Sequence, residues 1–486
     1  MPSPDGITRE ARLYALKELA RRAAVTPEFF RTWKVHFDAH ELLVEVLPPS
    51  AKRIRFKMHP LSAPGQNRSI CAARASWMRS PGEPTRSLVP DFVVPFAGQN
   101  GGNGRPLFVP VEADAVECPL DLLASTLLTL TRYEEAVSPV RDGYGRFPAA
   151  ATLAFREGFL GRPIVDEYGL ALEQALRYLL PGWQPEKRRV RVKLSHDIDD
   201  VGGLCYLNRG LRNARPRPSV RLAWMMLPFD GRFAIQKVVR EHDLAGAASH
   251  LWGRLTGSVP NCVDLVRQLV ALSKERGLDS AVYWKAGPLG KYDSGYDLRQ
   301  PKFQLLLDEL RRQGAELGVH PGYETFMAPQ RLASEVKLLR EALGEHRLGG
   351  RQHYLRWCPD TWVHWEQCDL AYDSTLTFAD HYGFRAGTCL PYRPWILAEN
   401  RESRLLEIPL AIMDGTLIDM QLSEERSFEA VKECFERSKL VGGVFTFLCH
   451  NRTLLREGYL AFYQRVLDLV SGGDKFDWRT PAPEMW

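Results

Sequence analysis

Cysteine is scarce and gives no pairing signal in this chain of 486 residues. The nine cysteines are scattered, odd in number and include no Cys-x-x-Cys pair. A secreted domain that depended on disulfides would use cysteine more densely and at more regular spacing. We therefore expect free thiols in a reducing compartment, which excludes a disulfide-stabilised scaffold.

Long apolar runs are missing as well. No stretch approaches the roughly 18 apolar residues that a transmembrane helix needs, and the longest run, 441–449, has the length of a strand. The first 24 residues lack the apolar core of a signal peptide, and their apolar residues recur at helical spacing among charges. The prediction is a cytoplasmic protein with no transmembrane segment.

The chain has no large excess of charge of either sign. Its 64 Lys and Arg residues face 59 Asp and Glu residues, for a net charge of +5. A dedicated nucleic-acid binder shows a concentrated basic stripe, so we expect no nucleic-acid partner. Apolar residues make up 45% and charged residues 25% of the chain. This ordinary composition excludes disordered, collagen-like and fibrous proteins.

The length predicts two or three domains of about 150 residues each, and the pattern of elements changes near residue 185. Before it, short strand-like runs, Pro/Gly/Asn loops and helical patterns at 120–133 and 168–180 predict an α+β accessory module. Pro, Gly and charged residues at 181–189 are typical of a linker. We therefore divide the chain into an accessory module, 1–185, and a second module, 186–486.

Strands and helices alternate throughout the second module. Strands are predicted at 190–195, 280–284, 316–320 and 351–357, and helices between them at 262–276, 303–314 and 331–344. This alternation is typical of parallel βα units, in an open sheet or a closed barrel. In such folds the chemistry gathers at the carboxyl ends of the strands.

The first of these strands ends in an acidic cluster that includes Asp197 and Asp199. Residues two apart in an extended strand point the same way, so one carboxylate could hold a metal ion while the other takes a proton. Carboxylates at a buried strand end are costly without a cation or a partner. An acidic turn that caps the next helix is the alternative.

Other polar residues lie at the ends of later strands. His320 ends the strand at 316–320, His450 follows the apolar run 441–449, and Arg351 and His353 share one face at 351–357. A single histidine after a strand is more often structural than a ligand. Two such histidines, an acidic cluster and an arginine at corresponding strand ends form a far more specific combination.

These motifs resemble, in their order, those of the polysaccharide deacetylase superfamily (NodB-homology, carbohydrate esterase family 4). The resemblance covers about 190–455 and rests on HDID (196–199), AELGVHPGY (315–323), Arg351, YDST (372–375), GFRAGTC (383–389) and FTFLCH (445–450). The segments at 132–147 and 163–168 resemble the N-terminal module that accompanies one subgroup in surface-polysaccharide gene clusters. The resemblance implies an α/β fold with a distorted (β/α)7-like barrel.

The resemblance also implies a mechanism. Asp199 and His320 would bind a divalent metal ion, expected to be zinc, which lowers the pKa of a bound water molecule. Asp197 would act as the general base, held ionised by Arg351. His450 would protonate the leaving amine. The implied activity is hydrolysis of an N-acyl group, expected to be N-acetyl, from an amino sugar of a surface glycan or of its nucleotide- or lipid-linked precursor.

The second motif departs from the family pattern, because Glu324 stands where a second histidine is usual. A catalytic zinc site normally has three protein ligands. Glu324 or His353 could supply the third, or the site has two ligands and the protein is an inactive member. We predict that His196 is a structural hydrogen-bonding neighbour and not a ligand.

Several other residues have a functional and a structural interpretation. Asp414 could support Arg351 or cap a turn, and Tyr292 and Asp293 could line a sugar site or lie in a solvent loop. Tryptophans are candidates for stacking on a sugar, although most such residues belong to the core; they are Trp284, Trp357, Trp362 and Trp365.

A long insertion, 202–261, follows the first motif. Its first part, 204–229, is basic and ends in apolar residues. Such a segment suits a phosphate-bearing or lipid-linked substrate or peripheral contact with an anionic membrane; docking on the accessory module is the alternative. Two other functions stay open: a hydrolase of a non-sugar amide, formamide or cyclic imide, and an inactive carbohydrate-binding protein. The sequence does not predict the oligomeric state.

Overall fold

The computed structural model describes residues 7–479 except for the following positions: 39, 47–51, 60–71, 97–103, 200, 202–237, 240–243, 246–247, 249–261 and 289. The basic segment predicted at 204–229 therefore lies outside the described residues, as does most of the insertion at 202–261. Among the described residues, no helix has the length and apolar character needed to cross a membrane.

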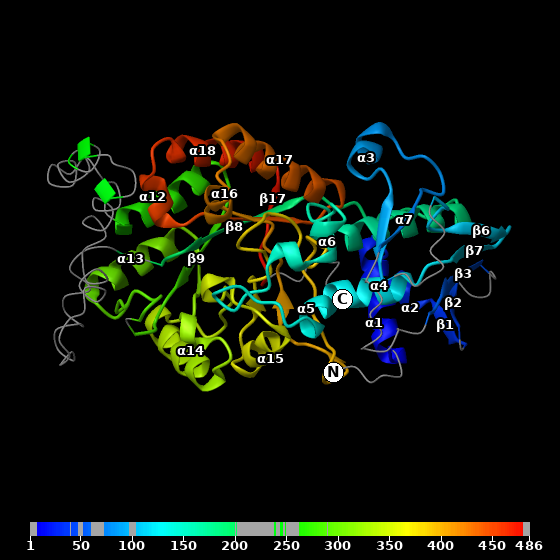
Figure 1. Cartoon of the computed structure of the whole chain (residues 1–486), viewed down its shortest axis with the longest axis horizontal. Helices are drawn as coiled ribbons and strands as arrows, with labels where there is room; N and C mark the ends of the chain where they lie inside the picture. The colour runs from blue at the N-terminus through cyan, green and yellow to red at the C-terminus, as the bar shows by residue number, and fades with distance from the viewer. Residues whose placement is uncertain are drawn as a thin grey trace.

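The N-terminal part of the chain contains a five-stranded sheet, seen at the right of Figure 1. Its strands lie in the order β1 (Lys34–Phe37), β2 (Glu41–Val46), β3 (Lys52–Lys57), β7 (Ala115–Cys118) and β6 (Val109–Glu112). Only the pairing of β3 with β7 is parallel. Alternate residues of β2 are buried, as a strand with one covered face requires.

Three helices accompany this sheet: α1 (Arg9–Arg22), α4 (Leu122–Leu130) and α7 (Ile164–Leu179). Helix α1 packs against both α4 and α7. All residues of α4 are buried, because its apolar side chains face neighbours on every side.

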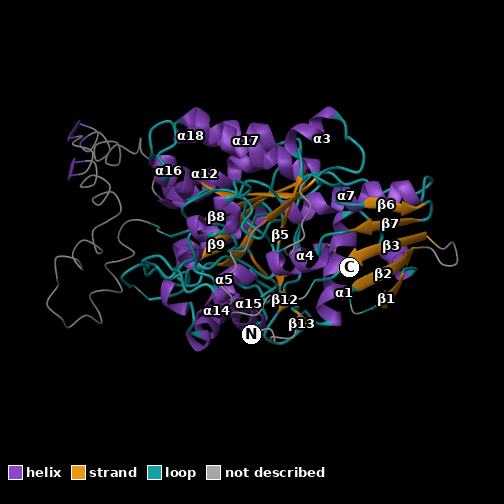
Figure 2. Ribbon diagram, turned by 45° about the vertical axis from the view of Figure 1, so that its right-hand side comes forward, coloured by secondary structure: helices purple, strands orange, loops and turns teal. Residues whose placement is uncertain are grey.

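The second part contains a row of parallel strands near the centre of Figure 2. The order is β10 (Glu316–Val319), β9 (Ser280–Trp284), β8 (Arg191–Asp197), β16 (Val444–Leu448) and β15 (Ile412–Met413), with β17 (Asp474–Lys475) beside the start of β8. Every residue of β9 and β16 is buried. Such continuous burial is typical of parallel strands that are covered on both faces.

Pairing continues beyond β10 through single residues. Gly350 bridges Val319 on one side and Asp373 on the other. The residue Asp373 belongs to β11 (Tyr372–Asp373), which pairs in parallel with β14 (Leu406–Glu407). The parallel row therefore extends from β15 at one end to β14 at the other.

Helices flank the parallel strands, with α17 and α18 above and α14 and α15 below in Figure 1. Their bounds are α12 (Cys262–Glu275), α13 (Pro301–Arg312), α14 (Pro329–Leu343), α15 (Pro359–Gln367), α16 (Asp414–Asp419), α17 (Glu424–Leu440) and α18 (Tyr459–Val470). Proline occupies the first helical position of α13 and α14, where its missing N–H costs nothing. The sequence predicted α12, α13 and α14 to within two residues at each end.

The mixed α/β class is confirmed, but the strand predicted at 351–357 is wrong. In its place a short 3-10 helix, η4, spans His353–Leu355. Tyr354 and Leu355 have positive φ angles of 61° and 55°. The left-handed region reverses the chain direction locally, so an extended run cannot pass through these two residues.

The two parts of the chain share one hydrophobic core. Its largest cluster includes Leu16 and Leu176 from the first part and Trp357 and Trp395 from the second. Ion pairs also join the parts: Arg385 donates through Nε to Glu135 Oε1 at 2.9 Å, and both side chains are buried. The division of the chain at residue 185 stays a prediction.

Candidate active site

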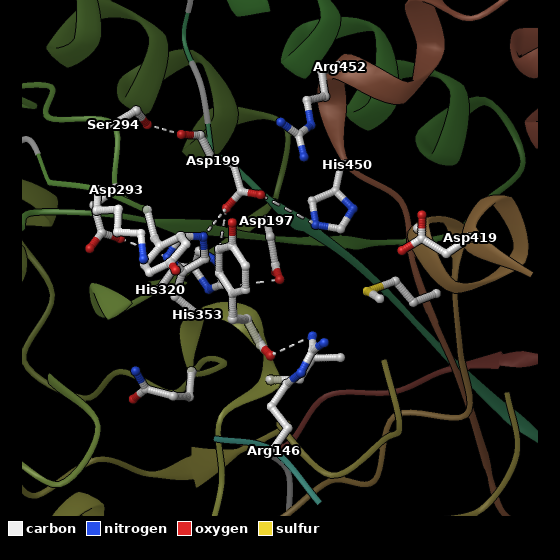
Figure 3. Close-up of a pocket in the computed structure, with 17 residues that line it drawn as sticks. Arg146, Asp197, Asp199, Asp293, Ser294, His320, His353, Asp419, His450 and Arg452 are labelled. Carbon is white, nitrogen blue, oxygen red and sulfur yellow. Dashed lines mark hydrogen bonds and ion pairs between the residues drawn. The ribbon is translucent and has the colours of Figure 1, made fainter. Parts of the chain in front are cut away.

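A cavity of about 420 Å³ lies at the carboxyl ends of the parallel strands (Figure 3). Strand β8 ends in the lining residue Asp197, and the lining residues His320 and His450 follow shortly after β10 and β16. Gln352 and His353 follow the bridge at Gly350. The lining residues are Arg146, Asp197, Asp199, Lys291, Tyr292, Asp293, Ser294, His320, Gln352, His353, Tyr354, Leu355, Met413, Gly415, Asp419, His450 and Arg452.

Three of these side chains converge on one point. Asp199 Oδ1 lies 3.1 Å from His320 Nε2 and 3.3 Å from His353 Nε2. One ligand atom from each of the three residues falls within 4.8 Å of the others. Burial opposes the negative charge of Asp199, yet the neighbouring imidazoles hold the pKa of its carboxyl well below the usual range. The sequence proposed each of these three residues as a ligand.

The second nitrogen of each histidine is held by the protein. His320 Nδ1 lies 2.7 Å from the carbonyl oxygen of Arg351, and His353 Nδ1 lies 2.7 Å from Asp293 Oδ1. With a proton on Nδ1, these contacts would be satisfied and the Nε2 lone pairs of the neutral rings would be free to bind a cation lying between them and Asp199. Metal-binding histidines are commonly oriented in this way.

The carboxylate of Asp293 contacts three segments of the chain, those that contain Lys285, Tyr323 and His353. It accepts from the backbone N–H of Tyr323 at 2.9 Å and from Lys285 Nζ at 2.6 Å, in addition to His353. Burial works against its charge, but His353 and Lys285 outweigh that effect and lower the pKa of Asp293. The buried Lys285 also lies 2.7 Å from His353 Nδ1. Of the two interpretations that the sequence left open for Asp293, the structure places it in the cavity lining and not in a solvent loop, and its carboxylate contacts His353.

Asp197 faces the same cavity from the end of β8. Arg351 Nη1 donates to its Oδ1 at 2.8 Å. The guanidinium is fully buried and also donates to Ser195 Oγ at 3.0 Å and to the carbonyl of Ser374 at 2.8 Å. Such a satisfied arginine fixes the orientation of the carboxylate.

His450 lies on the other side of Asp199, with 3.7 Å between His450 Nε2 and Asp199 Oδ2. Its Nδ1 donates to Asp414 Oδ1 at 2.6 Å. Burial alone would lower the pKa of His450, but the buried Asp414 carboxylate outweighs burial and raises it to about 9. Asp414 therefore supports His450, and the interpretation that it supports Arg351 is wrong.

Some predicted residues lie elsewhere. Glu324 is exposed and is neither in the Asp199 group nor in the cavity lining, so the structure brings His353 and not Glu324 to the candidate ligands. His196 is buried, and its ring contacts the Cys449 carbonyl and Ser280 Oγ, as a structural residue would. The four tryptophans are buried in the core and none lines the cavity: Trp284, Trp357, Trp362 and Trp365.

Sequence analysis missed several polar residues of this site, among them Lys285, Tyr354 and Arg146. Lys285 directly follows β9, so its place at a strand end was a signal that could have found it. Tyr354 enters the cavity through its left-handed backbone, and burial raises the pKa of its phenol to about 12. Arg146 comes from the N-terminal part of the chain, where no local signal marks it.

Comparisons with known proteins give limited information. Residues 35–181 match a family described as "Family of unknown function (DUF7033)". No curated protein matches the chain. A solved structure of a candidate polysaccharide deacetylase from Mycobacterium smegmatis is similar over 60% of this chain and 86% of its own, with 13% identity and a TM-score of 0.36. Likeness at this level assigns no function, so the functional argument comes from the site.

Proposed function

We propose that the protein is a metal-dependent hydrolase that removes an N-acyl group, N-acetyl in the first instance, from an amino sugar of a surface glycan or its precursor. One observation supports this most directly. A base held by an arginine and an imidazole held by a carboxylate flank the Asp199–His320–His353 group within one cavity. Amide hydrolysis needs these two proton-transfer groups around a site of carbonyl polarisation.

The donor set suits a divalent metal ion, zinc above all. Two imidazole nitrogens and one carboxylate oxygen are ligands found at catalytic zinc sites, and each imidazole has its second nitrogen anchored. Asp199, His320 and His353 would hold the ion. The chemistry that such an ion supplies is polarisation of a carbonyl and a lowered pKa of water.

Asp197 and His450 divide the proton transfers. Asp197 takes the proton of the attacking water, and Arg351 orients this carboxylate to accept it. His450 donates a proton from its Nε2 to the leaving nitrogen, because its Nδ1 is already hydrogen-bonded to Asp414. The amide C–N bond breaks as that nitrogen is protonated, and the products are a free amine and a carboxylate.

The fold that we propose for this module is a distorted seven-stranded barrel. The segment 406–413 supports it, because its first residues pair with β11 and its last pair with β16. The two strands of this segment, β14 and β15, are the opposite ends of the parallel row. Thr446 Oγ1, on β16, donates to the carbonyl of Pro409 at 2.6 Å between the two pairings. One chain segment thus joins the ends of the row.

Metal content and turnover test the proposal together. Elemental analysis of the purified chain should find about one zinc per molecule, reduced in Asp199→Ala and His320→Ala and retained in Glu324→Ala. Asp197→Asn should keep the metal and lose release of acetate from N-acetylglucosamine substrates. Equal metal content in all variants, or full turnover by Asp197→Asn, would contradict it.

The released acid identifies the amide. Acetate release from an acetylated amino sugar supports the proposed activity. Formate release, or ring opening of a cyclic imide with no acetate release, would show the same site acting on another amide. Bound zinc with no turnover of any amide would indicate an inactive carbohydrate-binding protein.

A further inference from the structure

We propose that the substrate carries an anionic group, a phosphate or a carboxylate, which Arg146 and Lys291 bind at one wall of the cavity. This inference rests on the proposed function and names the substrate class of the same site. The wall is built from both parts of the chain. Its core is the tyrosine cluster, defined here as Tyr144, Tyr292, Tyr323 and Tyr354.

The N-terminal part reaches the cavity through the loop that holds Tyr144 and Arg146. The ring of Tyr144 lies 5.8 Å from that of Tyr292 and 5.1 Å from that of Tyr354. Tyr323 Oη donates to the carbonyl of Tyr144 at 3.2 Å. These contacts join segments about 150 to 210 residues apart in sequence and place Arg146 in the cavity lining. The accessory module therefore shapes the substrate site directly.

Arg146 is held in position but keeps donors for a ligand. Its Nε donates to Asp142 Oδ2 at 2.8 Å, and its Nη1 donates to the carbonyl of Tyr354 at 3.4 Å. Its Nη2 has no hydrogen-bond partner among the residues that the structure describes. The side chain is 19% exposed, and its guanidinium lies over the Tyr144 ring at 4.8 Å. A guanidinium fixed in this way offers a planar fork to a carboxylate or phosphate.

Lys291 provides the second cation. Its Nζ lies 4.3 Å from the centre of the Tyr292 ring, so Arg146 and Lys291 stand over two rings that contact each other. The residue is exposed and lines the cavity. Within the described part of the chain, no carboxylate lies within ion-pairing distance of its ammonium group. Its charge is therefore available to a ligand.

Among the described residues, the carboxylates that line the cavity form no ion pair with Arg146 or Lys291. Asp197 is paired with Arg351, and Asp293 is paired with Lys285. Asp199 belongs to the proposed ligands. Two other acids lie nearby. Asp419 lines the cavity and is exposed, and Asp142 forms an ion pair with Nε of Arg146.

On the side of the Asp199 group opposite Arg146, Arg452 adds another positive charge (Figure 3). The cavity thus has an acidic centre for a metal ion and cations around it. A phosphate or carboxylate would accept from Nη2 of Arg146 and would supply a counter-charge to Lys291, whereas a neutral amino sugar would supply none.

Paired substrates test the inference. The specificity constant kcat/KM for acetate release is measured with N-acetylglucosamine, with its 1-phosphate and with N-acetylmuramic acid. A charged hydrogen bond lost from a partly buried site lowers affinity by about tenfold or more. We expect at least one anionic sugar to exceed the neutral sugar by about that factor, and Arg146→Gln and Lys291→Gln to reduce this ratio severalfold each.

Matched controls make the same chemical changes elsewhere. Arg331→Gln and Lys337→Gln alter exposed cations of α14 outside the cavity lining and should keep the wild-type ratio. Preference for the 1-phosphate identifies a phosphate ligand, and preference for N-acetylmuramic acid identifies a carboxylate. An equal kcat/KM for all three sugars, or an unchanged ratio in both cavity variants, overturns the inference while the proposed hydrolysis stands.

Binding gives a readout that does not depend on turnover. Calorimetric titration with N-acetylglucosamine 1-phosphate and with N-acetylmuramic acid should show weaker binding of the preferred sugar to Arg146→Gln than to Arg331→Gln, and the difference should shrink as salt screens the charges. If no sugar is hydrolysed, this weakening still supports anion recognition. Equal binding of both sugars by these two variants contradicts anion recognition in either case.

Discussion

Asp414 accepts two hydrogen bonds from His450. One carboxylate oxygen accepts from the ring Nδ1 at 2.6 Å, and the other accepts from the backbone N–H of the same residue at 2.8 Å. Asp414 is itself fully buried at the start of α16, next to the end of β15. The ring of His450 therefore has one fixed orientation relative to Asp199.

The first prediction follows from this contact. Asp414→Asn should lower turnover of an acetylated amino sugar by about 100-fold, since general acid catalysis of this kind contributes about 10² to 10⁴. Steady-state kinetics measure the loss. The double variant Asp414→Asn/His450→Ala should be no slower than His450→Ala, because the two residues act as one unit. Additive losses would show that Asp414 acts independently of His450.

The second prediction concerns the third ligand. His353→Ala should reduce the affinity for zinc by at least tenfold, because it removes one of three donors around the ion. Glu324→Ala serves as the control on a nearby exposed carboxylate. Competition with a chelator measures both affinities. The reverse result, with loss of zinc only in Glu324→Ala, would restore the alternative that the structure disfavours.

The third prediction concerns Asp293, which acts through His353. Asp293→Asn should weaken zinc binding by about 10- to 100-fold, the usual effect of removing a carboxylate that orients a ligating histidine. Asp360→Asn, at an exposed position of α15, is the control. Thermal unfolding of the zinc-free protein separates a loss of orientation from a loss of fold. An unchanged zinc affinity would remove the positioning role.

The fourth prediction concerns the buried carboxyl pair Asp373 and Glu407, which face each other in adjacent strands. Burial raises the pKa of Asp373 to about 7, and burial together with Asp373 raises that of Glu407. In the unfolded chain both groups ionise near pH 4. The unfolded state therefore binds fewer protons between about pH 4 and 7, so the free energy of unfolding should fall as the pH rises through this window.

Removing one member of the pair should flatten that dependence. Glu407→Gln should lose less stability between pH 5 and 8 than the wild type, because each tenfold difference in proton affinity between the folded and the unfolded chain is worth about 1.4 kcal/mol. Urea denaturation at several pH values measures the change, with Glu324→Gln as an exposed control. Parallel stability curves for the wild type and Glu407→Gln would show that the pair does not titrate in this range.

The fifth prediction concerns Gly350, where the backbone of β10 approaches closely. A Cβ at this position would collide with the carbonyl oxygen of Val319. Gly350→Ala should therefore destabilise the fold by about 3 kcal/mol, as overpacking of a rigid site does. Denaturant unfolding measures it. Gly472→Ala, where nothing lies within 4 Å of the added carbon, should change stability little; equal effects would contradict the close approach.

The regular elements around the site could be predicted from local sequence. The apolar segments that form β9 and β16 are strand-length and fully buried, and amphipathic spacing marked α13 and α14. Strand ends then indicated where Asp197, His320 and His450 would lie, because parallel strands present their carboxyl ends at one edge. These predictions needed only the period of the hydrophobic pattern.

The remaining parts depend on contacts that no local pattern encodes. The left-handed backbone of Tyr354 and Leu355 replaced an expected strand, and neither residue type favours that conformation. Asp293 reaches His353 from a loop 60 residues away, and Arg146 contacts Tyr354 across 208 residues. Such partners are selected by tertiary packing, so a single sequence does not show them.

The buried carboxylate of Asp166 sets a limit on how this protein can be shortened or recombined. It accepts from Arg22 Nε and from the backbone N–H of Cys389, both deep in the shared core. A fragment that starts near residue 186 would lose the Asp166 acceptor of that N–H and the Glu135 carboxylate that pairs with Arg385. Truncated versions for crystallography should therefore keep the N-terminal part, and chimeras with related chains should exchange the segment 387–389 together with it.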